Sequence, residues 1–216
     1  MKLLFLIGAP LAAVVARALM TPAYQDDADQ PDTPRYLTEL AEAATRNDAA
    51  AMIALLGAVL YVGAALALGS ILRSHLGRIA AALSVVGAFG LAAWSIQVLL
   101  AGVLAEQPDR EAMIALLDKL NTASEFSVFY LAMIAGALGS LLFGFALYRS
   151  RAVPRAAALI TGLGGATLML TAPGPLVVFV VGGAALALIG FTWTALSAVD
   201  AVEEIPTEPV RIRHAR

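Results

Sequence analysis

Glu125–Arg155 reads EFSVFYLAMIAGALGSLLFGFALYRSRAVPR. An acidic residue opens this stretch, the run Phe126–Tyr148 carries no charge, and arginines crowd the turn that follows. At about 1.5 Å rise per residue, the uncharged run is roughly 34 Å long as a helix, which is enough to cross a hydrocarbon core about 30 Å thick. The stretch therefore predicts a transmembrane helix with one acidic and one basic end.

The composition extends this prediction to the whole chain of 216 residues. Hydrophobic residues make up 60% of the sequence and charged residues only 14%, whereas soluble domains carry about 25% charge. This excess of apolar surface favours lipid as the solvent. The chain has no cysteine, which excludes disulfides and thiol chemistry. Its abundance of Ala and Gly suggests a high-GC bacterial genome.

Apolar segments recur along the chain and predict an all-α fold, a polytopic membrane helix bundle with six transmembrane helices. The predicted spans cover residues 3–20, 50–72, 79–104, 126–148, 156–171 and 176–199. Prolines at positions 173 and 175 separate the last two spans, because a helix does not continue through them. Residues 1–199 are predicted to form a single transmembrane bundle and residues 200–216 a mobile cytoplasmic tail.

The first predicted span has two interpretations. A basic start at Lys2, an apolar run and the triplet Ala16-Arg17-Ala18 resemble a secretory signal with a small-x-small cleavage site. Alternatively, the segment is an uncleaved first helix of just sufficient length to span. The sequence favours the retained helix, because an arginine beside the cleavage position is awkward and a polytopic protein needs no removable signal.

Two polar stretches, residues 21–49 and 105–124, separate the spans on the side opposite the basic loops. The first is predicted to contain a short surface helix that leads into the membrane, and the second an amphipathic helix that lies at the interface or caps the bundle. The apolar positions of the first helix are Tyr36, Leu37, Leu40 and Ala44. Those of the second helix are Met113, Ile114, Leu116, Leu117 and Leu120.

Basic residues divide unequally between the two sides of a six-span arrangement. One side, which holds both termini, has Lys2, Arg73, Arg78, Arg149, Arg151, Arg155, Arg211, Arg213 and Arg216. The other side has Arg35, Arg46, Arg110 and Lys119. The positive-inside rule then puts both termini in the cytoplasm, so we expect a multi-pass protein of the bacterial cytoplasmic (inner) membrane, with the lipid bilayer as its main partner.

Ionisable side chains inside spans usually mark function, because they are costly to bury in lipid. Arg17, Gln97 and Glu125 are predicted to lie at similar depth, toward the outer side. They could form an intramembrane polar cluster in which Arg17 pairs with Glu125. The interpretation that we favour is that Arg17 and Glu125 reach the interface separately, while Gln97 bonds a neighbouring helix.

Other motifs have both a structural and a functional interpretation. Gly136, Ser140 and Gly144 are spaced four apart and form a small face, which indicates close helix packing. Tyr61 and Trp94 fit interfacial anchors or packing. The basic turn could hold anionic lipid headgroups, or its charges could only set the orientation. Its candidate headgroup contacts are Arg149, Arg151 and Arg155.

Motifs for catalysis or cofactor binding are missing from the sequence. Neither His75 nor His214 has further ligands at metal-binding spacing. No His-Glu-x-x-His, Gly-x-Ser-x-Gly or phosphate-loop pattern occurs. We therefore expect no cofactor, no metal, no nucleic-acid partner and no enzymatic activity.

The segment Leu147–Ala156, with the sequence LYRSRAVPRA, carries a family resemblance. A span ending in Leu-Tyr-Arg-Ser, then a small loop with Pro-Arg, then a short Gly-rich helix resembles a family of bacterial six-helix integral membrane proteins known only as a domain of unknown function. The resemblance implies a retained first helix and six spans. It brings no catalytic residues with it.

The sequence leaves three classes of function. The first is a non-enzymatic membrane protein that packs against itself or a membrane-protein partner, or senses the envelope through its outer loops. Scarce charge in the spans and abundant small residues favour this class. The second is a small transporter or channel for an apolar or weakly polar solute, which needs a water-lined path. A membrane-embedded enzyme is the least favoured, because no acid–base or metal constellation is present.

Overall fold

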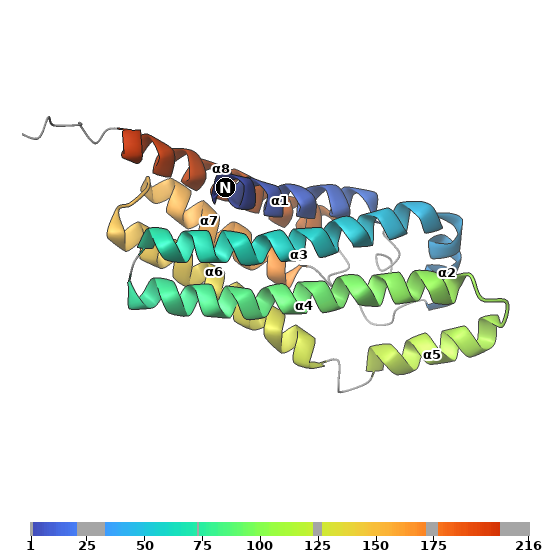
Figure 1. The fold of residues 1–216 in the computed structure, drawn as a ribbon. Helices are drawn as coiled ribbons and strands as arrows, with labels where there is room; N and C mark the ends of the chain where they lie inside the picture. The colour runs from blue at the N-terminus through green and yellow to red at the C-terminus, as the bar shows by residue number, and fades with distance from the viewer. Residues whose placement is uncertain (1, 21–32, 73, 123–126, 172–176, 204–216) are drawn as a thin grey trace, which may run out of the picture.

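Helix formers and apolar residues dominate the sequence, and most of the chain that the structure describes is helical. The computed structural model describes residues 2–20, 33–72, 74–122, 127–171 and 177–203. This part of the chain folds into eight helices and no strands, which confirms the all-α prediction (Figure 1). The helices are α1 (Lys2–Leu19), α2 (Thr33–Glu42), α3 (Ala44–Leu72), α4 (His75–Ala105), α5 (Arg110–Thr122), α6 (Ser127–Ser150), α7 (Arg155–Leu170) and α8 (Val177–Glu203).

Four of these helices, α1, α3, α4 and α6, are long and apolar enough to cross a membrane. Two further apolar helical segments, α7 and the part Val181–Ser197 of α8, are shorter. Several apolar helices of this kind indicate a membrane-embedded protein. The crossing of the membrane by α7 and α8 as well stays a prediction.

Six helices form a closed ring, in which α1, α3, α4, α6, α7 and α8 each pack on the next. The ring closes where α8 packs back on α1. Short connections join α3 to α4 and α6 to α7, so these neighbours run antiparallel (Figure 1). The α4 end of the first connection is fixed by Ser74, whose Oγ accepts a hydrogen bond from the Gly77 N–H at 3.0 Å.

Glycines set how closely the ring helices approach. A Cβ atom at Gly87 of α4 would lie 2.4 Å from the Gly136 Cα of α6, and one at Gly144 would lie 2.8 Å from the Gly162 Cα of α7. The backbones are therefore in contact at both crossings. This confirms that the small face of α6 serves packing, although Gly136 and Gly144 approach two different helices.

Large apolar side chains cover the outside of the ring. Phe89 of α4 is 67% exposed, and Leu66, Phe145 and Leu196 are also exposed. Such an apolar surface is unfavourable in water and ordinary against lipid tails.

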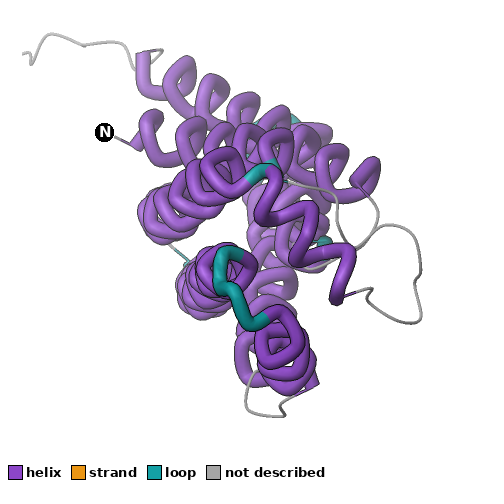
Figure 2. The backbone as a smooth tube through the Cα atoms, turned by 90° about the vertical axis from the view of Figure 1, so that its right-hand side faces the viewer, coloured by secondary structure: helices purple, strands orange, loops and turns teal. Residues whose placement is uncertain are grey.

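A helical cap lies at one end of the ring, against α3 and α4. It consists of α2, α5 and the ends of α3 and α4 that pack with them, and Figure 2 views the molecule from this end. Its apolar core is Tyr36, Leu37, Leu40, Ala101, Ala105 and Leu117. Both predicted amphipathic helices thus form, and they bury part of their apolar stripes against each other and α4. The helices α3 and α4 continue from the ring into the cap without a break.

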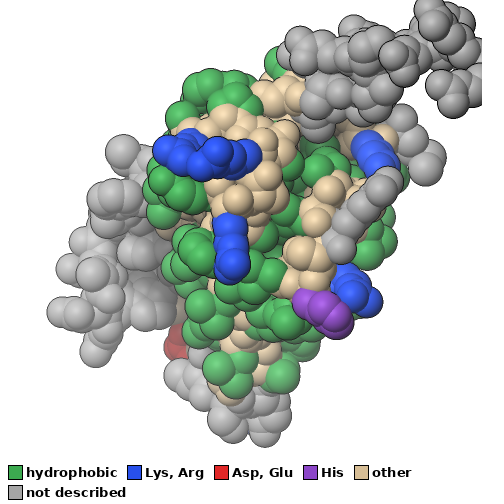
Figure 3. Space-filling model, turned by 90° about the vertical axis from the view of Figure 1, so that its left-hand side faces the viewer, with side chains coloured by type: hydrophobic (Ala, Val, Ile, Leu, Met, Phe, Trp, Pro, Cys, Tyr) green, Lys and Arg blue, Asp and Glu red, His purple; other side chains and the backbone are tan. Residues whose placement is uncertain are grey.

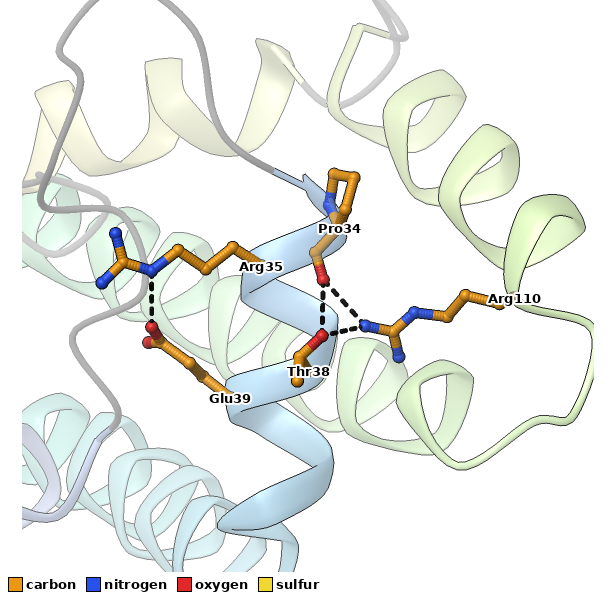
Figure 4. Close-up of polar contacts among 5 residues, drawn as sticks. All are labelled: Pro34, Arg35, Thr38, Glu39 and Arg110. Atoms are coloured by element: carbon orange, nitrogen blue, oxygen red, sulfur yellow. Dashed lines mark hydrogen bonds and ion pairs between the residues drawn. The ribbon is translucent and has the colours of Figure 1, made fainter.

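Polar contacts join the two short helices of the cap. Arg110 of α5 donates hydrogen bonds from Nη2 to the Pro34 carbonyl oxygen at 2.7 Å and to Thr38 Oγ1 at 2.5 Å (Figure 4). In the opposite sense, Thr33 Oγ1 of α2 donates a hydrogen bond to the carboxylate of Asp118 of α5. Reciprocal bonds between α2 and α5 fix their relative position.

We predict that Gly87→Ala destabilises the ring, because the new methyl group meets the backbone of Gly136. The expected loss in the free energy of unfolding is about 1–3 kcal/mol, as measured by thermal or denaturant unfolding in detergent. Gly182→Ala in α8 is the matched control, since a Cβ there has no neighbour within 4 Å. Equal stability of both variants would contradict the close crossing.

Candidate functional site

Uncharged polar side chains lie buried within the ring. They are Tyr61 of α3, Ser84 and Ser95 of α4, Ser140 of α6, Thr161 of α7 and Thr194 of α8. In an apolar medium each needs a hydrogen-bond partner, and backbone carbonyls or other hydroxyls are the partners available. These side chains are the natural starting point for a site.

Tyr61 occupies the middle of the ring. Its Oη lies 2.7 Å from Ser140 Oγ, and Ser140 Oγ donates its own proton to the Gly136 carbonyl at 3.0 Å. Because a serine hydroxyl has one proton, Tyr61 is the donor of the bond between them. The Tyr61 ring also packs on Phe191, with 6.0 Å between centroids. Tyr61 is only 3% exposed and joins α3, α6 and α8, so it is a packing residue.

Two further hydroxyls repeat this arrangement at the contact of α7 with α8. Thr161 Oγ1 donates to the Ala157 carbonyl at 2.8 Å. It lies 2.8 Å from Thr194 Oγ1, which is therefore the donor to Thr161. In each case one hydroxyl donates to a hydroxyl on another helix, and that second hydroxyl donates to a carbonyl of its own helix. These bonds hold α3 to α6 and α7 to α8.

Ser84 has a different environment. Its Oγ is buried and makes no hydrogen bond with the residues that the structure describes, although it lies near the Tyr61 hydroxyl. A Cβ at Gly139 would lie 2.6 Å from this oxygen, so the glycine makes room for it. Ser84 is the one buried side chain in the described part of the chain with an unsatisfied polar atom.

A small cavity of about 30 Å³ adjoins Tyr61 on the side toward the cap. Its polar lining comes from Arg17, Tyr61, Trp94 and Ser95, and much of the rest is alanine. This volume has room for a water molecule or two. It is far below the roughly 300 Å³ that a small organic ligand needs.

Arg17 lies at the rim of this cavity. Its guanidinium carbon is 4.0 Å from the centroid of a Trp94 ring, which is a cation–π contact. Its Nη1 also points to Met20 Sδ at 3.7 Å. The sequence does not indicate this pairing, because Trp94 in an apolar run also fits an interfacial anchor or packing.

The structure describes only part of the predicted polar cluster. Gln97 lies on α4, three residues after Trp94 and hence on the same side of that helix, and is half-buried. Glu125 lies outside the described residues. The cluster of Arg17, Gln97 and Glu125 therefore stays a hypothesis.

The basic turn lies at the end of the ring opposite the cap. Arg149, Arg151 and Arg155 are all exposed. Figure 3 views this end and shows Lys and Arg side chains across it, with almost no Asp or Glu in sight. The exposure of the arginines leaves them accessible to an anion, and their contact with lipid headgroups stays a prediction.

The fully buried polar side chains of the ring that the structure describes carry hydroxyl groups. A hydroxyl becomes a nucleophile only beside a base, and the hydroxyls at Tyr61, Ser140 and Thr161 contact other hydroxyls or carbonyls. Within the described residues, no group of three or more His, Asp or Glu side chains could hold a metal ion. These contacts are suited to joining helices.

Comparison with known proteins places the whole ring in one family. A family model described as Domain of unknown function (DUF4386) matches residues 3–199. The chain belongs to this family. The DUF4386 match runs from α1 through the cap and into α8, so it confirms the resemblance noted at Leu147–Ala156 and extends it to the whole bundle. No curated protein and no solved structure matches the chain.

We predict that Tyr61→Phe lowers the free energy of unfolding in detergent by about 0.5–1.5 kcal/mol, because it removes the donor to Ser140. A double-mutant cycle with Ser140→Ala should show coupling, since both variants break one bond. Tyr130→Phe on the exposed part of α6 is the control and should change little. Additive effects of the two substitutions would refute the bond.

Proposed function

We propose that this DUF4386 protein is a six-span, non-enzymatic protein of the bacterial cytoplasmic membrane, with both termini in the cytoplasm. Its proposed role is to pack against a second copy or a membrane-protein partner, or to sense the envelope through the helical cap. The proposal rests on one observation: direct backbone contacts and hydrogen bonds between hydroxyl groups hold the helices of the ring together in its interior.

The ring supports six crossings. The helices α7 and α8 lie between α6 and α1, both of which are long enough to span, and they share close backbone crossings with their neighbours. Helices packed side by side along their length occupy the same depth. At about 1.5 Å per residue, α7 is roughly 24 Å long, a mismatch that local thinning of the bilayer accommodates.

The charge distribution supports the orientation. The described basic residues at the end opposite the cap include Arg78, Arg149, Arg151 and Arg155, while α2 and α5 carry acidic residues such as Glu39, Glu111 and Asp118. By the positive-inside rule the cap then faces outward, where it could contact an envelope component.

The orientation can be tested with single cysteines, because the chain has none of its own. We predict that Glu111→Cys in the cap and Gly174→Cys between α7 and α8 react with a membrane-impermeant maleimide in intact cells. Ser74→Cys and Ala152→Cys should react only after the membrane is opened. Reaction of Ala152→Cys in intact cells would show that the orientation is the opposite one. Protection of Gly174→Cys would show that α7 and α8 do not cross the membrane.

Exposed apolar side chains near the cap support a partner. The consecutive residues Val128, Phe129, Tyr130 and Leu131 of α6 are all exposed, and Leu131 is 63% exposed. Because consecutive residues point to different sides of a helix, this end of α6 presents apolar side chains in several directions, while its backbone at Phe129 packs against Gly90 of α4. Leu116 of α5 is also exposed. A membrane-protein partner or a second copy could cover these side chains.

We predict that a photo-crosslinking residue at Leu131 captures a protein, either a second copy or a partner, in native membranes. Leu66 of α3 is the matched control, since it is also an exposed leucine, at 58%, and should capture only lipid. Monomers alone in mild detergent, with no protein adduct from Leu131 or Leu116, would refute a partner-binding role.

The alternative is a small transporter or channel for an apolar or weakly polar solute. The cavity beside Arg17 and the unsatisfied hydroxyl of Ser84 favour it, because water can enter a polar space of this size. Transport would require a second conformation that separates α4 from α6 at Gly87. Saturable solute flux in proteoliposomes that contain the wild-type protein, and none in protein-free liposomes, would support this alternative over the packing role.

A further inference from the structure

The turn between α6 and α7 holds its arginines in a defined arrangement. Arg151 has a left-handed backbone conformation, with φ at 56°, and Val153 is buried beneath the turn. Ser150 Oγ accepts the Ala152 N–H at 3.3 Å and donates to the Leu147 carbonyl at 3.1 Å. The turn is thus anchored to the ring while its arginines stay exposed.

One arginine is fixed against an aromatic ring. The Arg155 guanidinium carbon lies 5.2 Å from the centroid of the Tyr148 ring, within the range of a cation–π contact. Tyr148 is the last large aromatic residue of α6, and Arg155 is the first residue of α7. The contact holds the positive charge across the junction of the two helices.

Exposed apolar stripes run from this charge along both helices. On α6, Leu141, Phe145 and Tyr148 follow i, i+4, i+7 spacing and are all exposed, Phe145 by 55%. On α7, Leu159 and Leu163 follow Arg155 at i+4 and i+8 and are more than half exposed. Arg155 therefore lies at the end of both stripes, where a cationic group meets two apolar faces.

We propose that the basic turn and these two stripes bind an anionic phospholipid, with its phosphate at Arg155 and its acyl chains along Phe145 and Leu159. A guanidinium pairs with phosphate through two parallel hydrogen bonds. Arg149 and Arg151 add positive potential, and so does the start of α7, where Pro154 offers no side-chain cap. The apolar stripes select a lipid over free phosphate. This proposal rests on the proposed membrane embedding.

The test compares lipids retained by the full-length protein. Wild type is reconstituted with equimolar phosphatidylglycerol and phosphatidylcholine of the same acyl chains, then released into mild detergent for native mass spectrometry. We expect wild type to retain phosphatidylglycerol preferentially. In R149Q/R151Q/R155Q the preference should fall by roughly fivefold for each arginine that contacts the headgroup. An unchanged preference would overturn the proposal.

Two further variants distinguish a specific lipid site from a general effect of net charge. R35Q/R46Q/K119Q removes the same positive charge from exposed residues of the cap and should keep the preference. F145S/L159S keeps every charge and should lower lipid retention. Loss of preference in the cap variant, or full retention in the stripe variant, would reduce the effect to general electrostatics and overturn the site.

Competition and insertion complete the test. Added inorganic phosphate should not displace the bound phosphatidylglycerol, and displacement would assign the arginines to a free anion instead. Membrane insertion of every variant is checked by fractionation. A wild type that does not enter membranes refutes the proposed function, whereas one that inserts without preferring phosphatidylglycerol refutes only the lipid site.

Discussion

Close contact between helix backbones is the constraint on which this structure depends. Lipid tails are as apolar as leucine, so a helix gains little by moving a leucine from lipid to protein. Association must then come from dense van der Waals contact and from hydrogen bonds. Gly87 against Gly136 and Gly144 against Gly162 provide the first, because no Cβ holds the backbones apart. These pairs fix the crossings of α4 with α6 and of α6 with α7.

Hydrogen bonds between hydroxyls complete the association. Tyr61 to Ser140 joins α3 to α6, and Thr194 to Thr161 joins the consecutive helices α7 and α8. Each acceptor hydroxyl also bonds a carbonyl of its own helix, so these pairs leave no polar atom unsatisfied. Ser84 departs from this pattern, because it packs closely against Gly139 but its buried Oγ makes no hydrogen bond with the described residues.

Much of the architecture could be predicted, because it depends on local patterns. Long apolar runs predict the membrane-spanning helices, and amphipathic spacing predicts the helices of the cap. Small residues spaced four apart predict the close packing of α6. The pairing of Tyr61 with Ser140, and of Arg17 with Trp94, could not be predicted in this way. The spacing of serine, threonine and tyrosine in an apolar run does not indicate which residue each of them will bond. That depends on how each helix is rotated in the ring.

The unbroken passage of α3 and α4 from ring to cap has a mechanical consequence. At about 1.5 Å per residue these helices of 29 and 31 residues are roughly 43 and 46 Å long, well beyond the thickness of a hydrocarbon core. Residues at the cap end of this length pack with α2 and α5. Continuous helix, and not a flexible loop, thus joins the cap to the ring through α3 and α4, so a displacement of the cap acts directly on two ring helices.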